Sequence, residues 1–233
     1  MDKKEPLEIP LPLRVASQTA TQWVYSTLRF AIMSGQICPG RLITIRELAS
    51  ELNVSAMPVR EAIRQLAAEH ALEILENRRV RVPHMTPMKF TELFEARIAL
   101  ESHTGSRALP YIDTTILDDI QAIDQRIQHA RIDLEYDQLI TLNQEFHRAI
   151  YLANPHQVTL SLIESIWLQL GPFMRQANRN QENKHLINRH NEIIAAIKRK
   201  DAFALQVAIA ADIREGFSLA SQPEQLQKVI NNE

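Results

Sequence analysis

Cysteine, glycine and long apolar runs are all scarce in this chain of 233 residues, which has one Cys and five Gly. The single cysteine, Cys38, excludes an intramolecular disulfide, as is typical of a reducing compartment, and we expect it to be a small buried residue. The apolar residues 7–13 are interrupted by Pro10 and Pro12 and are too few for a signal-peptide core or a membrane span. We therefore expect a cytoplasmic protein without a membrane partner.

Charge of one sign is not in excess either, because the net charge is only −2. Taken over the whole chain, this balance gives no indication of a nucleic-acid partner. Residues 1–87, however, hold 11 Lys and Arg against 9 Asp and Glu, whereas residues 88–233 hold 15 against 19. Hydrophobic residues make up 45% of the chain, which is usual for a globular protein, and the length suits about two domains. This small difference in charge between the two parts of the chain agrees with two domains that have different functions.

Residues 44–66 show the pattern of two short helices joined by a tight turn. Thr44 and Glu47 have the spacing of a capping box, which predicts a helix that begins there. Asn53 is expected in the turn, and Ser55 is expected to cap the second helix. Apolar residues recur on one face of each helix, namely Ile45, Leu48, Ala49 and Leu52 in the first and Val59, Ile63, Leu66 and Ala67 in the second. This pattern is a helix-turn-helix, which is typical of DNA-binding proteins.

The second helix of such a motif enters the major groove and places its N-terminal residues at the base edges. Arg60 and Arg64 lie beside or away from the buried face of this helix. An arginine can donate two hydrogen bonds to a guanine or to a phosphate. We therefore expect this helix to contact double-stranded DNA.

A β-hairpin is predicted directly after the motif, because residues 72–75 and 80–82 alternate like two strands around residues 76–79. Arg78, Arg79 and Arg81 place three positive charges at or near its tip, where they can reach phosphates or a minor groove. A hairpin in this position is a wing. The alternative is a solvated hairpin end that does not contact DNA.

Helical periodicity replaces the strand signals from Pro87 onward, and the breaks in it separate six expected helices. These are residues 87–109, 113–131, 135–153, 156–178, 183–199 and 201–220. Thr86, Asp113 and Asp201 fit N-cap positions, and Gly171-Pro172 should kink or split the fourth helix. Another helix is expected over residues 18–34, ahead of the helix-turn-helix, with Gly35 as its stop.

The expected fold is therefore mainly α. A winged helix-turn-helix of three helices and a β-hairpin wing is followed by an antiparallel six-helix bundle, whose interior is the usual place for a small-molecule or metal site. The expected boundaries are an N-terminal tail over residues 1–17, the DNA-binding domain over 18–85, the helical domain over 86–222 and a C-terminal tail over 223–233.

Several segments of the N-terminal part carry a pattern specific enough to indicate a protein family. They are residues 28–35, Pro39-Gly40, residues 46–49 and Val54-Ser55-x-x-Pro58-Val59-Arg60-Glu61-Ala62. In these segments the N-terminal part resembles the DNA-binding domain of the GntR family of bacterial transcription regulators. The helical part, in residues 93–101, 146–150 and 190–197, is similar to the FCD-type effector domain of the FadR subfamily. Six C-terminal helices place it nearer the VanR-like branch. The resemblance implies a homodimer on a palindromic operator, and we expect a repressor.

The resemblance also implies DNA contacts position by position. Arg46 matches the arginine that opens the first helix of the motif, and Arg60 matches the arginine of the Pro-Val-Arg-Glu segment. The arginine that usually follows Ser55 is Ala56 here, so discrimination at one base pair should change by about 1–3 kcal/mol. The family's glycines before the wing and at its tip correspond to Ala71 and Arg79. The expected DNA-contacting residues are Arg46, Ser55, Ala56, Met57, Arg60, Arg64, Asn77, Arg78 and Arg79.

In many members of this subfamily an Asp, a His four residues later and two further His bind a divalent metal, which holds a small carboxylate effector. The matching residues are Asn143, His147, His190 and Asp212, so one carboxylate is lost and another is gained. Two imidazoles, a carboxylate and an amide oxygen suit Zn²⁺, Ni²⁺ or Mn²⁺. The alternative is that both histidines are core residues whose hydrogen bonds Asn143 and Asp212 satisfy.

Arg97 matches an arginine that reaches toward the effector in the family, and a guanidinium can hold a carboxylate with two hydrogen bonds. Its alternative is an ion pair with Glu101, four residues later. The expected mechanism is an effector that binds one arrangement of the domains better and so lowers operator affinity. Two other classes of protein remain as alternatives. One is a DNA-binding dimer without metal or effector, and the other is a metal-dependent enzyme, for which no base or nucleophile stands at a fitting spacing.

Overall fold

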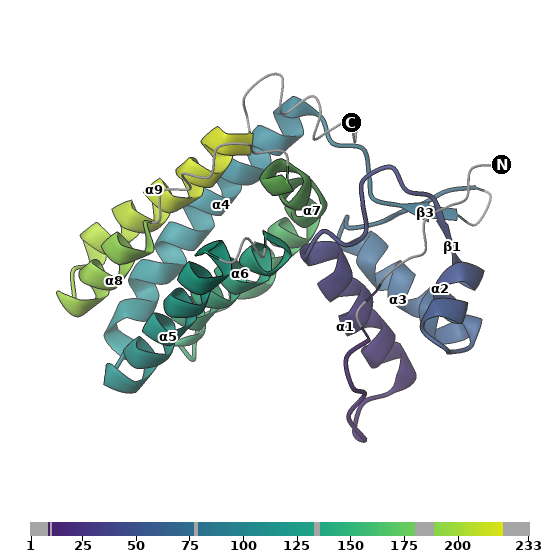
Figure 1. Cartoon of the computed structure of the whole chain (residues 1–233), viewed down its shortest axis with the longest axis horizontal. Coiled ribbons are helices and arrows are strands. Elements are labelled where there is room, and N and C mark those ends of the chain that lie inside the picture. Colours follow the sequence, from purple (N-terminus) through teal and green to yellow (C-terminus); the bar gives the residue numbers. More distant parts are fainter. Residues whose placement is uncertain (1–8, 10, 77–78, 133–135, 180–188, 221–233) are drawn as a thin grey trace.

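Two lobes of different make-up form the molecule in the computed structural model, which describes residues 9, 11–76, 79–132, 136–179 and 189–220. The N-terminal lobe holds short helices and a small sheet, and the C-terminal lobe is a bundle of longer helices (Figure 1). The predicted mainly α fold is confirmed. Within the described residues, no helix combines the length and the apolar composition that a membrane span requires.

The N-terminal lobe contains three helices and three short strands in chain order. They are α1 (Ala20–Met33), β1 (Ile43–Thr44), α2 (Ile45–Glu51), α3 (Ala56–Ala68), β2 (Glu73–Ile74) and β3 (Arg79–Arg81). Thr44 caps α2 in the predicted capping box with Glu47, and Thr19 caps α1 in a second capping box with Gln22. Gly35 follows α1 with φ +71°, a left-handed conformation that glycine adopts without strain.

The sheet is antiparallel, with the strand order β1-β3-β2. Val80, at the centre of the sheet, pairs with Ile43 on one side and with Ile74 on the other, and it is buried. The predicted hairpin is therefore present. The additional strand β1 was not expected, because two residues directly before a helix cap give no period-2 signal in the sequence.

The C-terminal lobe contains the six predicted helices within the described residues. They are α4 (Pro87–Ala108), α5 (Thr114–Ile132), α6 (Tyr136–Leu152), α7 (Leu160–Arg179), α8 (His190–Lys198) and α9 (Ala202–Ala220), with a 3₁₀ turn over Leu109–Tyr111. Helix α4 packs against α9, α5 against α6, and α8 against α9. The side chains of Thr86, Asp113 and Asp201 accept the hydrogen bonds expected of N-caps.

Two local expectations were wrong, namely the start of the fourth helix and the burial of Cys38. Helix α7 begins at Leu160 rather than 156, because Asn154 and Gln157 accept backbone N–H bonds in the preceding turn. Pro172 lies inside α7 without splitting it. Cys38 is exposed rather than buried, because it lies in the surface loop between α1 and β1.

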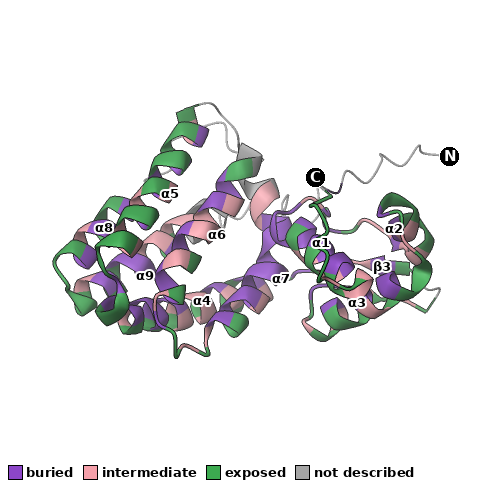
Figure 2. Ribbon diagram, turned by 90° about the horizontal axis from the view of Figure 1, so that it is seen from below, coloured by how far each residue is buried: buried purple, intermediate pink, exposed green. Residues whose placement is uncertain are grey.

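The lobes meet where α1 packs against α7. Buried residues continue from α7 into α1 in Figure 2, so the two cores are joined rather than separated by a solvated linker. This junction lies beside the helices that carry the candidate ligand site.

Candidate functional site

The helix-turn-helix buries its apolar residues and exposes the side chains that are predicted to contact DNA. Leu48 of α2 and Val59, Ile63 and Leu66 of α3 are buried, and Asn53 takes φ +49° in the turn between the helices. The side chains predicted to contact DNA from these helices are exposed, namely Arg46, Ser55, Ala56, Met57, Arg60 and Arg64. The structure therefore leaves all six residues accessible on α2 and α3.

Two details of this surface differ from the expectation. Ser55 occupies the N-cap position of α3, but its side chain makes no capping hydrogen bond, so the hydroxyl is available to another partner. Arg64 is paired with Glu61 at 2.9 Å, although both side chains are largely exposed. Exposed pairs of this kind contribute only about 0–1 kcal/mol, so a phosphate can replace Glu61 at little cost.

The structure describes only part of the wing. Asn77 and Arg78 lie outside the described residues, and Arg79 is exposed where β3 begins. Arg81 forms an ion pair with Glu73 of the neighbouring strand, with 3.0 Å between Nε and Oε2. Arg81 is thus engaged within the hairpin.

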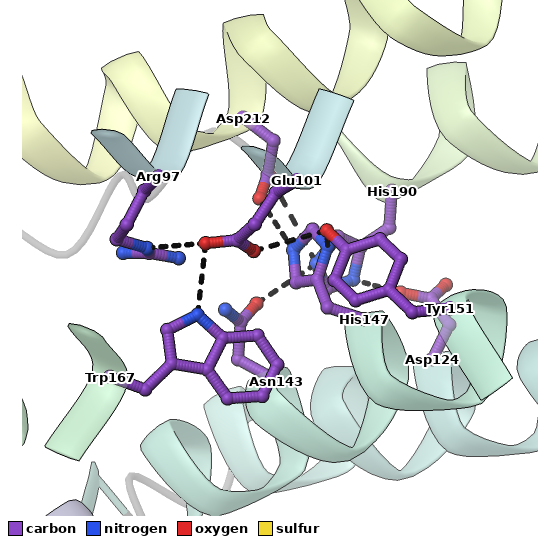
Figure 3. Close-up of polar contacts among 9 residues, drawn as sticks. All are labelled: Arg97, Glu101, Asp124, Asn143, His147, Tyr151, Trp167, His190 and Asp212. Atoms are coloured by element: carbon purple, nitrogen blue, oxygen red, sulfur yellow. Dashed lines mark hydrogen bonds and ion pairs between the residues drawn. The ribbon is translucent and has the colours of Figure 1, made fainter. Parts of the chain in front are cut away.

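A second polar cluster lies inside the helical lobe, and Figure 3 shows it in close-up. His147 of α6 and His190 of α8 are both buried, and their rings meet Asp212 of α9. The His147 Nε2 atom is 3.0 Å from Asp212 Oδ2, and the His190 Nε2 atom is 3.9 Å from Asp212 Oδ1. Asn143 Oδ1 lies 3.0 Å from His190 Nε2. The four residues predicted as a metal-ligand set are therefore brought together.

The far nitrogen of each ring is held by a residue that sequence reasoning missed. His190 Nδ1 lies 2.9 Å from Asp124 Oδ1, on α5, and Phe146 stacks on the same ring with 3.9 Å between centroids. His147 Nδ1 lies 3.2 Å from the Tyr151 hydroxyl. Tyr151 follows His147 by four residues and so shares its helical face, which was a usable signal, whereas nothing in the sequence points to Asp124.

These contacts place both Nε2 atoms toward one point and both Nδ1 atoms toward outer partners. A metal-binding histidine shows the same division, since its second nitrogen donates to a carboxylate, carbonyl or hydroxyl that fixes the ring. The hydrogen bonds of the metal-free alternative are also present, because Asp212 and Asn143 can satisfy the two Nε2 atoms directly. The hydrogen bonds are therefore compatible with a metal site and with two core histidines.

Asp212 is ionised in this setting. Burial raises the pKa of its carboxyl, but the hydrogen bond and charge of His147, followed by the charges of His190 and Arg97, more than offset burial and lower the pKa below its ordinary value. The cluster therefore holds one carboxylate next to two imidazoles.

Arg97 forms an ion pair with Glu101, with 2.6 Å between Nε and Oε1. This ion pair was the predicted alternative to a contact with the effector. Glu101 is completely buried and also accepts bonds from Trp167 Nε1 at 2.9 Å and from the Tyr151 hydroxyl at 3.0 Å. Burial lowers the pKa of Arg97, but the charge and hydrogen bond of Glu101, together with Tyr151 and Asp212, more than offset burial and raise the pKa. Burial and the charge of Glu101 also hold the pKa of Tyr151 well above its ordinary value. Tyr151 thus stays a neutral link from Glu101 to His147.

A cavity of about 130 Å³ adjoins this cluster. Arg97, Asn143 and Asp212 reach it from the cluster, and Arg131 adds a second guanidinium. Much of the remaining wall is apolar, formed by Ile127, Leu139, Ile140, Trp167, Leu170 and Met174. Arg97 therefore lines the cavity and makes its ion pair at the same time. The arrangement can hold a small anion that has an apolar part.

Comparison with known proteins gives a family match for each lobe. Residues 20–82 match the bacterial regulatory proteins of the gntR family, and residues 92–215 match the FCD domain. The HTH-type transcriptional regulator McbR of Escherichia coli is 25% identical, over 87% of this chain and 93% of that protein. The gluconate operon transcriptional repressor of Bacillus subtilis is 28% identical, over 75% of this chain and 74% of its own. The solved structure of E. coli McbR/YncC shares the fold, with a TM-score of 0.82 at 24% identity over 86% of this chain and 96% of that one.

Proposed function

Since the chain belongs to the GntR family of bacterial regulatory proteins and carries an FCD domain, it is a DNA-binding transcription regulator and not an enzyme, and we propose that it is a ligand-controlled repressor. In this proposal the protein acts as a homodimer of the FadR subfamily on a palindromic operator. A small carboxylate, held by a divalent metal ion in the helical lobe, lowers its operator affinity. One relative is a gluconate operon transcriptional repressor, which supports repression as the direction of control.

The DNA-contacting residues of the proposal are those that the fold leaves exposed on α2 and α3, with Arg79 on the wing. Arg46 and Arg60 are the positions where the family's arginines are kept, and they suit contacts with guanine or phosphate. Ala56 and Met57, which is 61% exposed, offer apolar contact to a thymine methyl group instead of a hydrogen bond.

The metal part of the proposal depends on one observation, which is the convergence of four ligand atoms beside a cavity. The ligand atoms of His147, His190 and Asp212 all lie within 4.8 Å of one another, and the Asn143 oxygen lies 3.0 Å from His190 Nε2. Spacings near 3 Å suit ligands that each bind one ion at about 2.0–2.2 Å. Two imidazoles with a carboxylate favour Zn²⁺, Ni²⁺ or Mn²⁺. When bound, the metal would supply a positive centre that takes an effector carboxylate.

Arg97 is the proposed second contact of that carboxylate. It lines the cavity, and the pairing with Glu101 fixes its side chain before any ligand arrives. A guanidinium fixed in this way orders a ligand at a lower cost in entropy than a mobile one. The apolar residues of the cavity wall would take the body of the effector.

The test is bound metal, measured by elemental mass spectrometry on untagged protein after incubation with Zn²⁺, Ni²⁺ or Mn²⁺ and gel filtration. We expect about one metal per chain in the wild type and none in His190→Ala, because one of two imidazoles is removed. Asp124→Asn should bind metal about 10–100-fold more weakly, because it changes only the outer partner of His190.

The matched control for Asp124→Asn is Asp119→Asn, an exposed carboxylate on the same helix, which should bind metal like the wild type. Absence of metal from the wild type under all three conditions would refute the metal part of the proposal and favour the hydrogen-bonded alternative. The DNA-binding part would be unaffected by that result.

A further inference from the structure

The ligand cavity and the junction between the two lobes share part of their walls. Gln144 and Trp167 line the cavity of the helical lobe, and both also line a groove of about 620 Å³ between α1, α6 and α7. Gly171 lines the cavity as well, on the part of α7 that touches α1. A ligand in the cavity would therefore lie against residues that also hold the DNA-binding lobe.

The contact at this shared wall is made with the last residue of α1. Gln144 Nε2 donates to the carbonyl oxygen of Met33 at 3.4 Å. The last four carbonyls of a helix have no intrahelical donor, so a side chain that supplies one stabilises the helix end. Gln144 thus ties α6, in the ligand lobe, to the C-terminal end of α1, in the DNA-binding lobe.

The same helix end is in backbone contact with α7. A Cβ atom built at Gly171 would lie 2.7 Å from the carbonyl carbon of Met33 and 2.8 Å from the carbonyl oxygen of Ile32, so only glycine permits this approach. Arg175 Nη1 donates to the carbonyl oxygen of Gly35 at 3.3 Å. Packing this close does not deform gradually, so a change at the end of α1 should alter how the whole lobe is seated.

We propose that Gln144 is the residue that transmits ligand binding to the DNA-binding lobe, by exchanging its bond to Met33 for a bond to a carboxylate in the cavity. This inference rests on the proposed carboxylate site. At 3.4 Å the bond to Met33 is long for an N–H···O bond, whose usual length is about 2.9–3.0 Å, and is therefore weak. A hydrogen bond to an ionised carboxylate is about twice as strong as a neutral one. The exchange is thus favourable, and it releases the end of α1.

Two neighbours show why the assignment falls on Gln144. Arg175 contacts the same helix end but does not line the cavity, whereas Arg97 lines the cavity and is bonded within its own lobe. Of these three residues, only Gln144 contacts the end of α1 and also lines the cavity. A coupling residue must make different contacts in the two states, and Gln144 donates to Met33 on one side and lines the cavity on the other.

The experiment is hydrogen exchange of the full-length protein, followed at the amides of Gly35, Gln36 and Ile37, which donate to carbonyls in the last turn of α1. The variants are Gln144→Leu and Arg175→Met, with Gln138→Leu, an exposed residue of the same helix α6, as the matched control. The ligand probe is Ni²⁺ with benzoate, and its binding to each protein is measured by calorimetry.

Without the probe, we expect exchange at these amides to be about two- to threefold faster in Gln144→Leu and in Arg175→Met than in the wild type, since each loses one long hydrogen bond at the weak end of the usual range. The probe should accelerate exchange in the wild type, in Arg175→Met and in Gln138→Leu. It should leave Gln144→Leu unchanged, although calorimetry shows that the probe is bound.

Two results would overturn the inference. One is a ligand-free exchange rate in Gln144→Leu equal to that of the wild type, and the other is a full response of Gln144→Leu to the bound probe. If calorimetry detects no binding to the wild type, the proposed carboxylate site fails for this probe. The ligand-free comparison then decides the Gln144 contact by itself, since faster exchange supports it and unchanged exchange refutes it.

Discussion

Arg60 is the side chain on which sequence recognition should depend most. It is exposed on α3 in the Pro-Val-Arg-Glu segment, while the neighbouring position that is usually arginine is Ala56. Few long cationic side chains therefore remain near the start of this helix to read bases. We predict that Arg60→Ala weakens binding to the selected operator by about 1–3 kcal/mol and relaxes the base preference at one position.

The measurement is a binding titration at fixed salt on a duplex selected from a random library by the wild-type protein. Single-base variants of that duplex are titrated alongside it. Arg107→Ala, an exposed arginine of α4 in the other lobe, is the control for lost charge and should bind as the wild type does. If Arg60→Ala kept both the affinity and the base preference, Arg60 would not be a base contact.

The proposed ligand set shows a second effect at the scale of single residues. The family pattern has a carboxylate where Asn143 stands and a histidine where Asp212 stands. In this protein both changes occur together, and Asp212 Oδ2 lies 3.0 Å from His147 Nε2. One carboxylate is thus retained in the cluster, supplied from α9 instead of α6. The proposed metal site therefore keeps one carboxylate in spite of the two departures from the family pattern.

At the scale of elements, the contact between α1 and α7 depends on a single glycine. We predict that Gly171→Ala destabilises the protein by about 1–3 kcal/mol, because the added Cβ must displace the backbone around Ile32 and Met33. The matched control is Gly216→Ala in α9, where a Cβ meets no atom within 4 Å. That change should stabilise the protein by about 0.5–1 kcal/mol through helix propensity.

Urea unfolding followed by circular dichroism measures both variants. Equal midpoints for Gly171→Ala and the wild type would mean that α1 and α7 are not held in backbone contact. A loss of stability in Gly216→Ala would instead show that the propensity argument fails for this bundle.

The sequence predicted elements better than it predicted contacts between them. Thr44 with Glu47, and Thr86, Asp113 and Asp201, are local signals, since each cap lies within four residues of its partner, and all four helix starts were found. The strand β1 was missed because its pairing with β3 joins residues far apart in the chain.

The same distinction holds for the site. His147 with Tyr151 and Arg97 with Glu101 are pairs four residues apart, and helical spacing brings each pair to one face. Asp124 lies 66 positions from His190, and Glu101 the same distance from Trp167, so no local pattern could predict these contacts. The family resemblance carried the ligand positions across such distances, but it said nothing of Asp124.

At the scale of the whole molecule, Glu164 of α7 connects the two lobes. Its side chain is 12% exposed, and its Oε2 atom lies 3.1 Å from Arg29 Nη2 on α1, while Oε1 is paired with Arg148 on α6. Arg29 also approaches Glu69, at the end of α3, with 3.6 Å between Nε and Oε2. One carboxylate thus opposes two arginines from different lobes, and its removal leaves both without their main partner.

We predict that Glu164→Gln separates the unfolding of the two lobes. The DNA-binding lobe is small and buries little apolar surface by itself, so it depends on the junction more than the helical lobe does. The lost pairing should cost about 1–3 kcal/mol, less than a fully buried pair, because the Arg148 side chain is 47% exposed. In scanning calorimetry, the wild type should show one transition with a calorimetric-to-van't Hoff enthalpy ratio near one, and the variant should show two.

Glu145→Gln is the control for this change. Glu145 and Glu164 both line the groove between α1, α6 and α7. Glu145, however, forms an exposed ion pair with Arg126, at 2.8 Å, within the helical lobe. Glu145→Gln should keep a single transition, since an exposed pair contributes little. A single, unshifted transition in Glu164→Gln would mean that the tight packing of α1 on α7 holds the lobes together without Glu164. The orientation of the two lobes would then depend on the end of α1, which Gln144 and Gly171 contact. A ligand in the cavity would in that case control DNA binding only through these contacts with α1.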